Sequence, residues 1–306
     1  MRVFYDTAKA AGKFKNAVVT TGSFDGVHIG HKVIIDRLNK IAHEIEGESV
    51  LITFHPHPRK VLYPEQTDLK LINTQEEKIE LLRKAGLQNL IIVRFSIEFS
   101  KTSSHEFITK ILVGQLNAKV VVVGHNHHFG HNRQGDFAYL HHLAEQYKFG
   151  VVEIPLQDIE NETVSSTKIR KALLGGNIQR ANAYLDHQYI ITGNLKNNAE
   201  LKQLHEITFF NIEISEPEKL VPPPGIYASN LYVNEKYLKS ITLVLNESEN
   251  NPKVISHLFY NKKAPLGQKG TIFFYKKVMD LPLSENNIID LQSFEKAIDM
   301  VEDLIY

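Results

Sequence analysis

The sequence predicts an α/β protein in two parts: a doubly wound parallel sheet, then a smaller, mostly antiparallel β-barrel-like domain with a C-terminal helix. Up to about residue 186, short runs rich in Val and Ile alternate with segments of helical periodicity, as in a parallel sheet covered on both faces. Beyond this point, close-spaced strand-like runs are separated by Pro, Gly and Asn, which is typical of antiparallel sheets and barrels. We therefore expect domains at 1–186 and 187–306.

Five runs of the first part read as buried strands: 17–22, 49–54, 89–95, 119–124 and 150–155. Amphipathic helices are expected between them, at 31–46, 74–86, 103–117 and 136–148. The last three begin at Thr74, Ser103 and Asp136, residue types that are favoured at a helix N-cap. Ligands of such sheets bind beyond the carboxyl ends of the strands. The first and fourth strands end in two unusual polar turns, where we expect the functional site.

Composition narrows the class of function. The chain has 306 residues, 42% of them hydrophobic and 23% charged, and its formal net charge is zero. This charge balance argues against a general attraction to nucleic acid or an anionic membrane. Cysteine is absent, which excludes disulfides and thiolate metal sites. With only strand-sized apolar runs and no recognisable signal peptide, we expect a cytoplasmic monomer or small homo-oligomer.

The turn after the first strand, GSFDGVHIGH, has the features of a polyphosphate site. Gly22, Gly26 and Gly30 let a ligand approach the backbone closely. His28 and His31 are three residues apart, which puts both imidazoles on one helical face. The helix N-terminus beneath them supplies free N–H groups and a partial positive charge. Imidazole donors placed there can stabilise charge on a transferred phosphoryl group; a simple polar helix cap is the alternative.

Four segments resemble, in the same order, the motifs of one enzyme family. They are GSFDGVHIGH (22–31), TFHPHPRKVL (53–62), VVVGHNHHFGHNRQGD (121–136) and VSSTKIRKAL (164–173). The first is similar to the H-x-G-H signature of the nucleotidyltransferase superfamily. Together, over residues 15–185, they resemble the FMN adenylyltransferase module of bacterial bifunctional riboflavin kinase/FAD synthetases.

This resemblance implies transfer of AMP from ATP to FMN, which gives FAD and pyrophosphate. ATP and FMN are then the small-molecule substrates, and Mg²⁺ accompanies ATP and bridges phosphate oxygens with few direct protein ligands. The FMN phosphate is already an anionic nucleophile, so alignment and charge stabilisation are most of what the enzyme must supply. His28 and His31 are the expected catalytic residues.

The resemblance also assigns residues to each substrate. Expected ATP contacts are Gly22, Phe24, Asp25, Gly30, Ser165, Ser166, Thr167 and Arg170. Expected FMN contacts are Pro56, His57, Pro58, Asn126, Phe129 and Arg133. Asp25 is expected to orient the turn or to contact the metal ion through water. Asn126 stands where the family commonly carries Asp.

Simpler interpretations remain open for three of the motifs. The segment that begins at Ser165 also reads as a well-capped surface helix. The prolines at 56 and 58 suit any stiff connection after a strand. The four histidines of the third motif are imidazoles of the kind that zinc binds, so a zinc site or an ordinary polar loop are competing interpretations there. These histidines are His125, His127, His128 and His131.

The second part resembles the riboflavin kinase half of the same family, but without the residues that carry its chemistry. PPPGIYA (222–228) and the terminal helix are similar. Phe209 stands where the kinase has a Thr that holds magnesium-ATP, and only Asn211 survives from that segment. Ile255 stands where the kinase has its general base, a Glu two residues before a His.

We therefore expect a kinase-like domain that has lost kinase activity, because it lacks both a base and metal ligands. A fully bifunctional riboflavin kinase/FAD synthetase is the first alternative. Another H-x-G-H nucleotidyltransferase and a flavin- or nucleotide-binding regulator on a degenerate enzyme scaffold are the others.

Overall fold

The computed structural model describes residues 1–65, 69–124, 128–155, 158–159, 162–198, 209–248, 251–259, 266–281 and 291–304. The chain forms two compact units. The first comprises Met1–Leu69 and Lys78–Val164, and the second comprises Lys70–Glu77 and Ser165–Tyr306. The second unit therefore contains a short segment from the first half of the sequence. The domain boundary at 186, which the sequence suggests from the change to close-spaced strand-like runs, stays a prediction.

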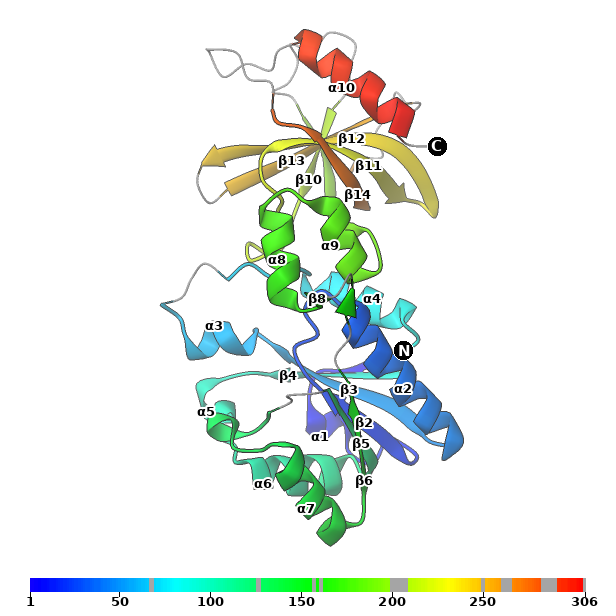
Figure 1. The fold of residues 1–306 in the computed structure, drawn as a ribbon, viewed down its shortest axis with the longest axis vertical. Coiled ribbons are helices and arrows are strands. Elements are labelled where there is room, and N and C mark those ends of the chain that lie inside the picture. The colour runs from blue at the N-terminus through cyan, green and yellow to red at the C-terminus, as the bar shows by residue number, and fades with distance from the viewer. Residues whose placement is uncertain are drawn as a thin grey trace. The chain divides into compact units, whose positions relative to one another are not determined.

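The first unit is built on a six-stranded sheet with the order β1-β4-β3-β2-β5-β6 (Figure 1). Every pair of neighbouring strands is parallel. The strands are β1 (Arg2–Phe4), β2 (Ala17–Thr21), β3 (Glu48–His55), β4 (Asn89–Arg94), β5 (Ala118–Gly124) and β6 (Gly150–Ile154). The predicted parallel sheet is confirmed. The edge strand β1 escaped prediction because three residues carry no periodic signal.

Helices cover both faces of this sheet. On one face, α2 (Ile29–Glu44) and α4 (Gln75–Lys84) pack in a cluster that includes Val18, Ile35 and Leu82. On the other face, Val19 packs with residues of α1 (Thr7–Ala10), η1 (Phe107–Gln115) and α7 (Phe137–Tyr147). Adjacent strand residues thus point into opposite cores, which explains the unbroken Val/Ile runs.

The predicted helix N-caps are confirmed in the structure. The Ser103 hydroxyl accepts a bond from the Glu106 amide (3.1 Å), and Asp136 accepts one from the Tyr139 amide (2.8 Å). Thr74 and Glu77 form a capping box at α4, in which each side chain accepts from the other residue's backbone N–H (3.1 and 3.0 Å).

The remaining short elements are α3 (Pro58–Leu62), α5 (Ile97–Ser100), α6 (Ser104–Glu106), η2 (His131–Arg133), β7 (Asp158–Ile159) and β8 (Glu162–Thr163).

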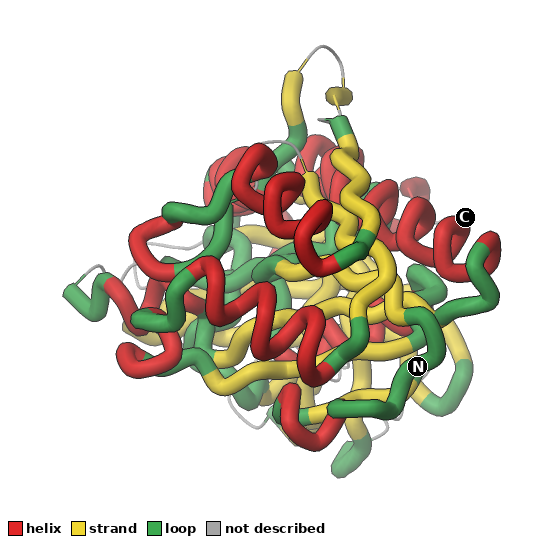
Figure 2. Tube along the Cα trace, turned by 90° about the horizontal axis from the view of Figure 1, so that it is seen from below, coloured by secondary structure: helices red, strands yellow, loops and turns green. Residues whose placement is uncertain are grey.

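The second unit is a closed antiparallel barrel with the strand order β10-β13-β12-β11-β14-β9. The strands are β9 (Tyr189–Asn197), β10 (Phe209–Glu213), β11 (Gly225–Val233), β12 (Lys236–Ser248), β13 (Asn251–Leu258) and β14 (Lys269–Met279). Helix α10 (Leu291–Leu304) lies on one side of the barrel, and α8 (Ser166–Leu174) and α9 (Ile178–Leu185) lie on the other (Figure 1). This confirms the predicted barrel with a C-terminal helix, and Figure 2 shows the same elements by type.

Along the barrel strands, apolar side chains that pack against α10 alternate with buried hydroxyl side chains that bond to one another. Phe209, Ile226 and Ile255 pack against the fully buried Phe294 of α10. The intervening positions hold hydroxyls that bond to one another: the Oγ of Ser229 lies 2.7 Å from the Oγ1 of Thr242, which lies 2.9 Å from the Oγ of Ser256. These polar groups are fully buried but satisfied, as buried polar groups must be.

The segment Lys70–Glu77 is joined to the second unit by backbone bonds. The Leu71 amide donates to the Glu218 carbonyl and the Leu220 amide donates to the Leu71 carbonyl, both at 2.7 Å. Helix α4 thus begins with residues of the second unit and continues with residues of the first. No helix among the described residues is long and apolar enough to cross a membrane.

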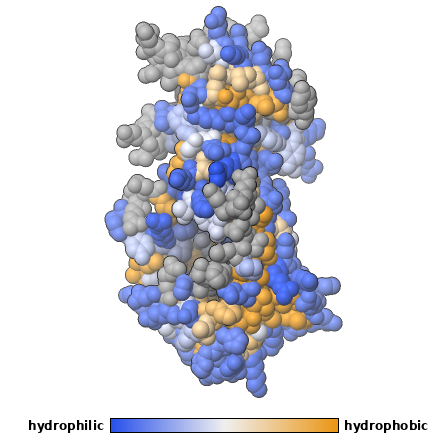
Figure 3. All heavy atoms as spheres, viewed as in Figure 1, coloured by the Kyte–Doolittle hydropathy of each residue, from blue (hydrophilic) through white to orange (hydrophobic). Residues whose placement is uncertain are grey.

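Large hydrophobic side chains that remain exposed are spread along the sequence. They are Tyr5, Leu62, Tyr63, Ile97, Phe137, Leu174, Tyr237, Leu266, Met300 and Leu304. The face drawn in Figure 3 is mostly hydrophilic, with hydrophobic areas between. Scattered apolar residues of this kind are normal on a protein surface and need no partner.

Candidate active site

The turn between β2 and α2 holds three aromatic rings in a stack. The imidazoles of His28 and His31 lie 3.7 Å apart between centroids, with an 18° angle between their planes. The ring of Phe24 stacks on the other side of His31, at 4.4 Å and 24°. His28 is the N-cap residue of α2 and has extended backbone angles, and His31 lies in the first turn. The structure therefore brings together the two predicted catalytic residues.

The glycines of this turn make the stack possible. A Cβ at Gly30 would lie 3.3 Å from two atoms of the His28 ring, and a Cβ at Gly22 would lie 3.0 Å from the Phe24 ring. Gly26 has a φ of 94°, a conformation that L side chains rarely adopt. The sequence suggested that glycine lets a ligand approach here. The structure adds that Gly30, which has no side chain, leaves room for the ring of His28.

The surroundings of His31 favour its neutral form. The pKa of His31 lies well below its usual 6.5, first because the ring is buried and then because of the charges on His28 and Lys78. The Nδ1 of His31 is buried and has no hydrogen-bond partner among the described residues. His28 is 7% exposed and Asp25 is 1% exposed. A buried ring nitrogen without a protein partner is suited to contact a bound ligand.

Lys78 is a residue of this site that sequence reasoning missed. It lies on α4, its side chain is only 5% exposed, and its charge acts on His31. Lysine is among the residues that are almost never fully buried unless they are paired. The one available signal was its position four residues before Leu82, which places a cation on the apolar face of the predicted helix.

The TFHPHP segment forms the end of β3 and the start of α3. Pro56 is exposed and follows a cis peptide bond, and Pro58 is the first residue of α3. The Nδ1 of His57 accepts a bond from the Arg59 amide at 3.2 Å, so this ring caps the helix. The predicted FMN contacts of this motif therefore share one turn at the carboxyl end of a strand.

Three phenylalanines beside this turn were not predicted as site residues. Phe54 precedes it on β3, Phe95 follows β4, and Phe99 lies on α5. Their ring centroids lie 5.6 to 5.8 Å apart, and all three side chains are partly exposed. Residues so far apart in sequence gave no local signal for this cluster.

The FGHNRQG segment folds back on α6. Phe129 and Gly135 exchange two backbone hydrogen bonds of 3.0 Å, and the Phe129 ring packs near Phe107. A Cβ at Gly135 would lie 2.5 Å from that ring, so glycine is needed there. The predicted contact Asn126 lies outside the described residues, as does the side chain of Arg133.

The zinc interpretation of the histidine-rich loop remains untested, because His125 and His127 also lie outside the described residues. Among the described part of the chain, no group of three or more His, Cys, Asp or Glu side chains could hold a metal ion. The Nδ1 of His131 lies 3.0 Å from the Ser100 carbonyl oxygen, which accounts for that ring nitrogen.

The S-S-T-x-I-R segment begins α8 in the second unit. Ser165 is the N-cap, and its hydroxyl accepts a bond from the Lys168 amide at 3.3 Å. Thr167 is exposed, and Ser166 and Arg170 are partly buried. The Nε of Arg170 donates to the Lys70 carbonyl at 2.9 Å, a bond within the second unit. The serine is thus a helix cap, and the structure leaves its role toward ATP a prediction.

The barrel positions compared with the kinase lie opposite one another on neighbouring strands. In the register of β10 and β13, Phe209 faces His257 and Asn211 faces Ile255. Phe209 is 3% exposed and Ile255 is 1% exposed. The Asn211 side chain accepts a bond from the Asn198 amide group at 2.8 Å.

Comparison with known proteins identifies a family whose model covers the histidine stack. The family model described as FAD synthetase matches residues 11–168. The chain belongs to the FAD synthetase family. It is a nucleotidyltransferase, and the histidine stack lies within the matched region.

Curated members of this family span most of the chain. It is 31% identical to a bifunctional riboflavin kinase/FMN adenylyltransferase of Listeria monocytogenes, over 72% of this chain and 69% of the relative. A protein of the same organism named FAD synthetase is 34% identical over 64% of this chain and 79% of its own length. A bifunctional relative from Buchnera aphidicola is 29% identical over 87% of this chain and 86% of the relative.

Among solved structures, a Streptococcus pneumoniae protein titled macrolide-efflux protein is similar across the whole chain. Its TM-score is 0.85, with coverage of 99% of this chain and 97% of that one. At 22% identity this likeness shows the shared fold alone.

Proposed function

We propose that this protein transfers AMP from ATP to FMN and releases FAD and pyrophosphate. The observation that carries the proposal is the stack of His28 and His31 at the N-terminus of α2. A helix N-terminus attracts phosphate, and the buried Nδ1 of His31 is a polar atom that a ligand can contact. Membership of the FAD synthetase family supports the choice of substrates.

In the proposed reaction, an oxygen of the FMN phosphate attacks the α-phosphorus of ATP. One P–O bond forms, the bond to the β-phosphate bridging oxygen breaks, and the electron pair leaves with pyrophosphate. No proton has to be removed from the nucleophile. His28 and His31 hydrogen-bond the phosphoryl oxygens and the leaving pyrophosphate, and they are already oriented by stacking.

The other predicted ATP contacts are Gly22, Phe24, Asp25, Gly30, Ser165, Ser166, Thr167 and Arg170. We propose that Mg²⁺ enters with ATP and neutralises its phosphate charge. Asp25 is a hard oxygen donor in this turn and fits an orienting role or a water-mediated contact with the ion. The remaining residues align the phosphates, which is the main demand of phosphoryl-type transfer.

For FMN we propose contacts from Pro56, His57, Pro58, Asn126, Phe129 and Arg133. The cluster of Phe54, Phe95 and Phe99 supports this side of the proposal. It offers partly exposed aromatic surface next to Pro56, and a flat flavin ring can pack on such a surface.

We further propose that the barrel no longer acts as a riboflavin kinase. Phe209 and Ile255 pack under Phe294 of α10 at the positions where the kinase would need a metal-binding Thr and a general base. An apolar cluster supplies neither a proton acceptor nor a metal ligand. Because several relatives are named bifunctional, retained kinase activity is the alternative that an experiment must test. Incubation with riboflavin, ATP and Mg²⁺ should yield no FMN above a heat-killed control; sustained FMN formation would restore a bifunctional enzyme.

The main proposal is tested with purified protein, FMN, ATP and Mg²⁺, with FAD measured by chromatography. His28→Ala and His31→Ala should each lower kcat by about 10²–10³, the usual cost of one preorganised donor. His141→Ala is the matched control, since His141 is an exposed histidine on α7. Absence of FAD from the unaltered protein, or preference for CTP over ATP, would overturn the proposal.

A further inference from the structure

Helices α2 and α4 lie side by side in a fixed register. The Asn39 side chain of α2 donates to the Gly86 carbonyl beyond the end of α4, at 3.2 Å. One helical turn earlier on each, Ile35 and Leu82 are fully buried in the same core cluster. Both helices follow parallel strands of one sheet, so they run in the same direction. The Asn39–Gly86 bond and the shared burial of Ile35 and Leu82 thus fix how the two helices are aligned.

Extended by one more helical turn, this alignment brings Lys78 toward His31. His31 lies four residues before Ile35, and Lys78 lies four residues before Leu82. An interval of four residues, about 6 Å of helix, keeps a side chain on the same face. The lowering of the His31 pKa by the Lys78 charge agrees with that position. Lys78 is 5% exposed, so its cation is held in a site from which most water is excluded.

A buried cation at this position has a chemical use. The proposed reaction brings the negative charges of ATP to His28 and His31 and moves further charge onto the leaving pyrophosphate. The neutral imidazole of His31 supplies a hydrogen bond but no net charge. An ammonium group in a partly desolvated site supplies the missing positive charge, and its effect there is larger than in water.

We propose that the Nζ of Lys78 contacts the phosphates of bound ATP and, with His28 and His31, stabilises the departing pyrophosphate. The inference rests on the proposed function and adds a third charge-stabilising residue to it. Its place in α4 is secured by the Thr74–Glu77 capping box immediately before it.

The test compares Lys78→Met, which keeps the apolar stem, with Lys84→Met, which removes an exposed lysine from the same helix. Lys78→Met should lower kcat/KM for ATP by about 10²–10³, the usual cost of losing one preorganised charge-stabilising group, and should leave KM for FMN unchanged. Lys84→Met should behave as the unaltered protein. Lys78→Arg, which keeps the charge, should recover part of the activity.

Inorganic pyrophosphate, titrated calorimetrically without FMN, gives a readout that does not depend on turnover. Lys78→Met should weaken its binding and Lys84→Met should not. If FAD is never formed but pyrophosphate binding still depends on Lys78, the proposed function fails and the phosphate contact stands. If pyrophosphate binding and kcat/KM for ATP are unchanged in Lys78→Met, the inference is overturned.

A purely structural role would give a different result. The melting temperature of Lys78→Met would fall, while kcat/KM for ATP per folded molecule would remain that of the unaltered protein, and this outcome also overturns the inference. Should Lys78→Met fail to fold, Lys78→Gln removes the charge with a polar side chain and is measured in the same way.

Discussion

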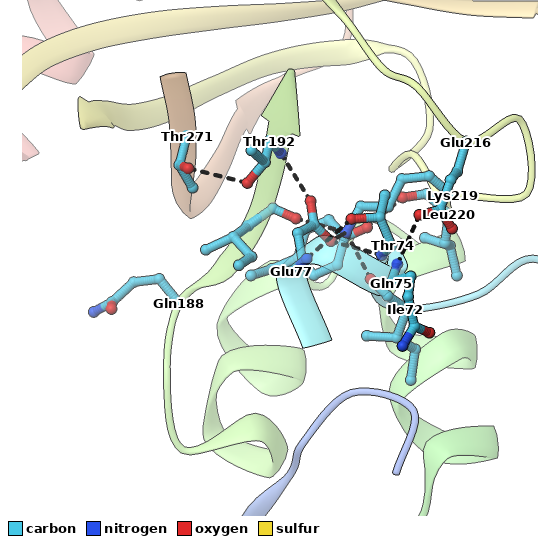
Figure 4. Close-up of polar contacts among 12 residues, drawn as sticks. Ile72, Thr74, Gln75, Glu77, Gln188, Thr192, Glu216, Lys219, Leu220 and Thr271 are labelled. Carbon is cyan, nitrogen blue, oxygen red and sulfur yellow. Dashed lines mark hydrogen bonds and ion pairs between the residues drawn. The ribbon is translucent and has the colours of Figure 1, made fainter. Parts of the chain in front are cut away.

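Lys219 and Glu77 form an ion pair from which water is excluded. The Nζ of Lys219 lies 2.5 Å from the Oε2 of Glu77, and the two side chains are 1% and 0% exposed (Figure 4). Lys219 also donates to the carbonyls of Ile72 (2.6 Å) and Ile190 (2.7 Å). Glu77 accepts bonds from the amides of Thr192 (2.8 Å) and Thr74 (3.0 Å). All three ammonium donors and both carboxylate oxygens have partners, which is the condition for a buried pair to persist.

Breaking this pair should destabilise the protein strongly. Lys219→Met leaves the Glu77 carboxylate buried without its counter-ion, which typically costs about 3–5 kcal/mol of unfolding free energy. Urea unfolding measures the loss. The double variant Glu77→Gln/Lys219→Met removes both charges and should be more stable than Lys219→Met alone. A Lys219→Met protein as stable as the original would show that the pair contributes nothing net.

Gly30→Ala should reduce activity without reducing stability in proportion. Alanine in a helix is favoured over glycine by roughly 0.5–1 kcal/mol. The new Cβ would lie 3.3 Å from the His28 ring, which must shift by a few tenths of an ångström. Because small misplacement of a catalytic group is costly, we expect kcat to fall about tenfold or more while the melting temperature is kept. Unchanged kcat would show that the ring position is not critical.

The titration of His31 should be displaced toward acid. Its folded-state pKa lies below 6.5 because of burial and the charges on His28 and Lys78. Between the two values the unfolded chain binds more protons, so unfolding free energy falls as pH drops below about 6.5 and is constant above it for this group. Histidine NMR signals, assigned by loss in His31→Gln, give the pKa directly. A value of 6.5 or higher contradicts the burial argument.

Arg170→Ala should raise KM for ATP more than it lowers kcat. The proposed phosphate contact is lost, since arginine is suited to bind phosphate oxygens. Its Nε bond to the Lys70 carbonyl is lost as well, so a modest loss of stability, about 1 kcal/mol, should accompany it. Steady-state kinetics with each substrate varied in turn separate the effects. A normal response to ATP with a damaged response to FMN would reassign this motif to the other substrate.

Most of the fold was predictable because its signals are local. Runs of Val and Ile gave five strands of the parallel sheet, and the residue types of Ser103 and Asp136 gave helix starts. The histidine pair was predictable for the same reason, since three residues separate its members. The segment predicted as a helix at 103–117 formed one, but mostly with π-helical hydrogen bonds, which residue preferences do not distinguish.

Features that depend on distant residues were not predictable. Lys78 joins the site only through the register of two helices, and the phenylalanine cluster needs three separate elements to meet. The Glu77–Lys219 pair joins residues 142 positions apart. Local periodicity contains no information about contacts between residues so far apart in sequence. From the sequence alone, Glu77 and Lys219 each look like an ordinary charged surface residue.

The membership of residues 70–77 in the second unit has a consequence for engineering. A chimera that exchanged the C-terminal half with that of a relative at one crossover point would inherit Glu77 from one parent and its lysine partner from the other. If the second parent lacked the lysine, the graft would bury an unmatched carboxylate. Recombination between these proteins should therefore succeed more often when the codons for residues 70–77 are exchanged together with the C-terminal half, and fail more often when a single junction is used.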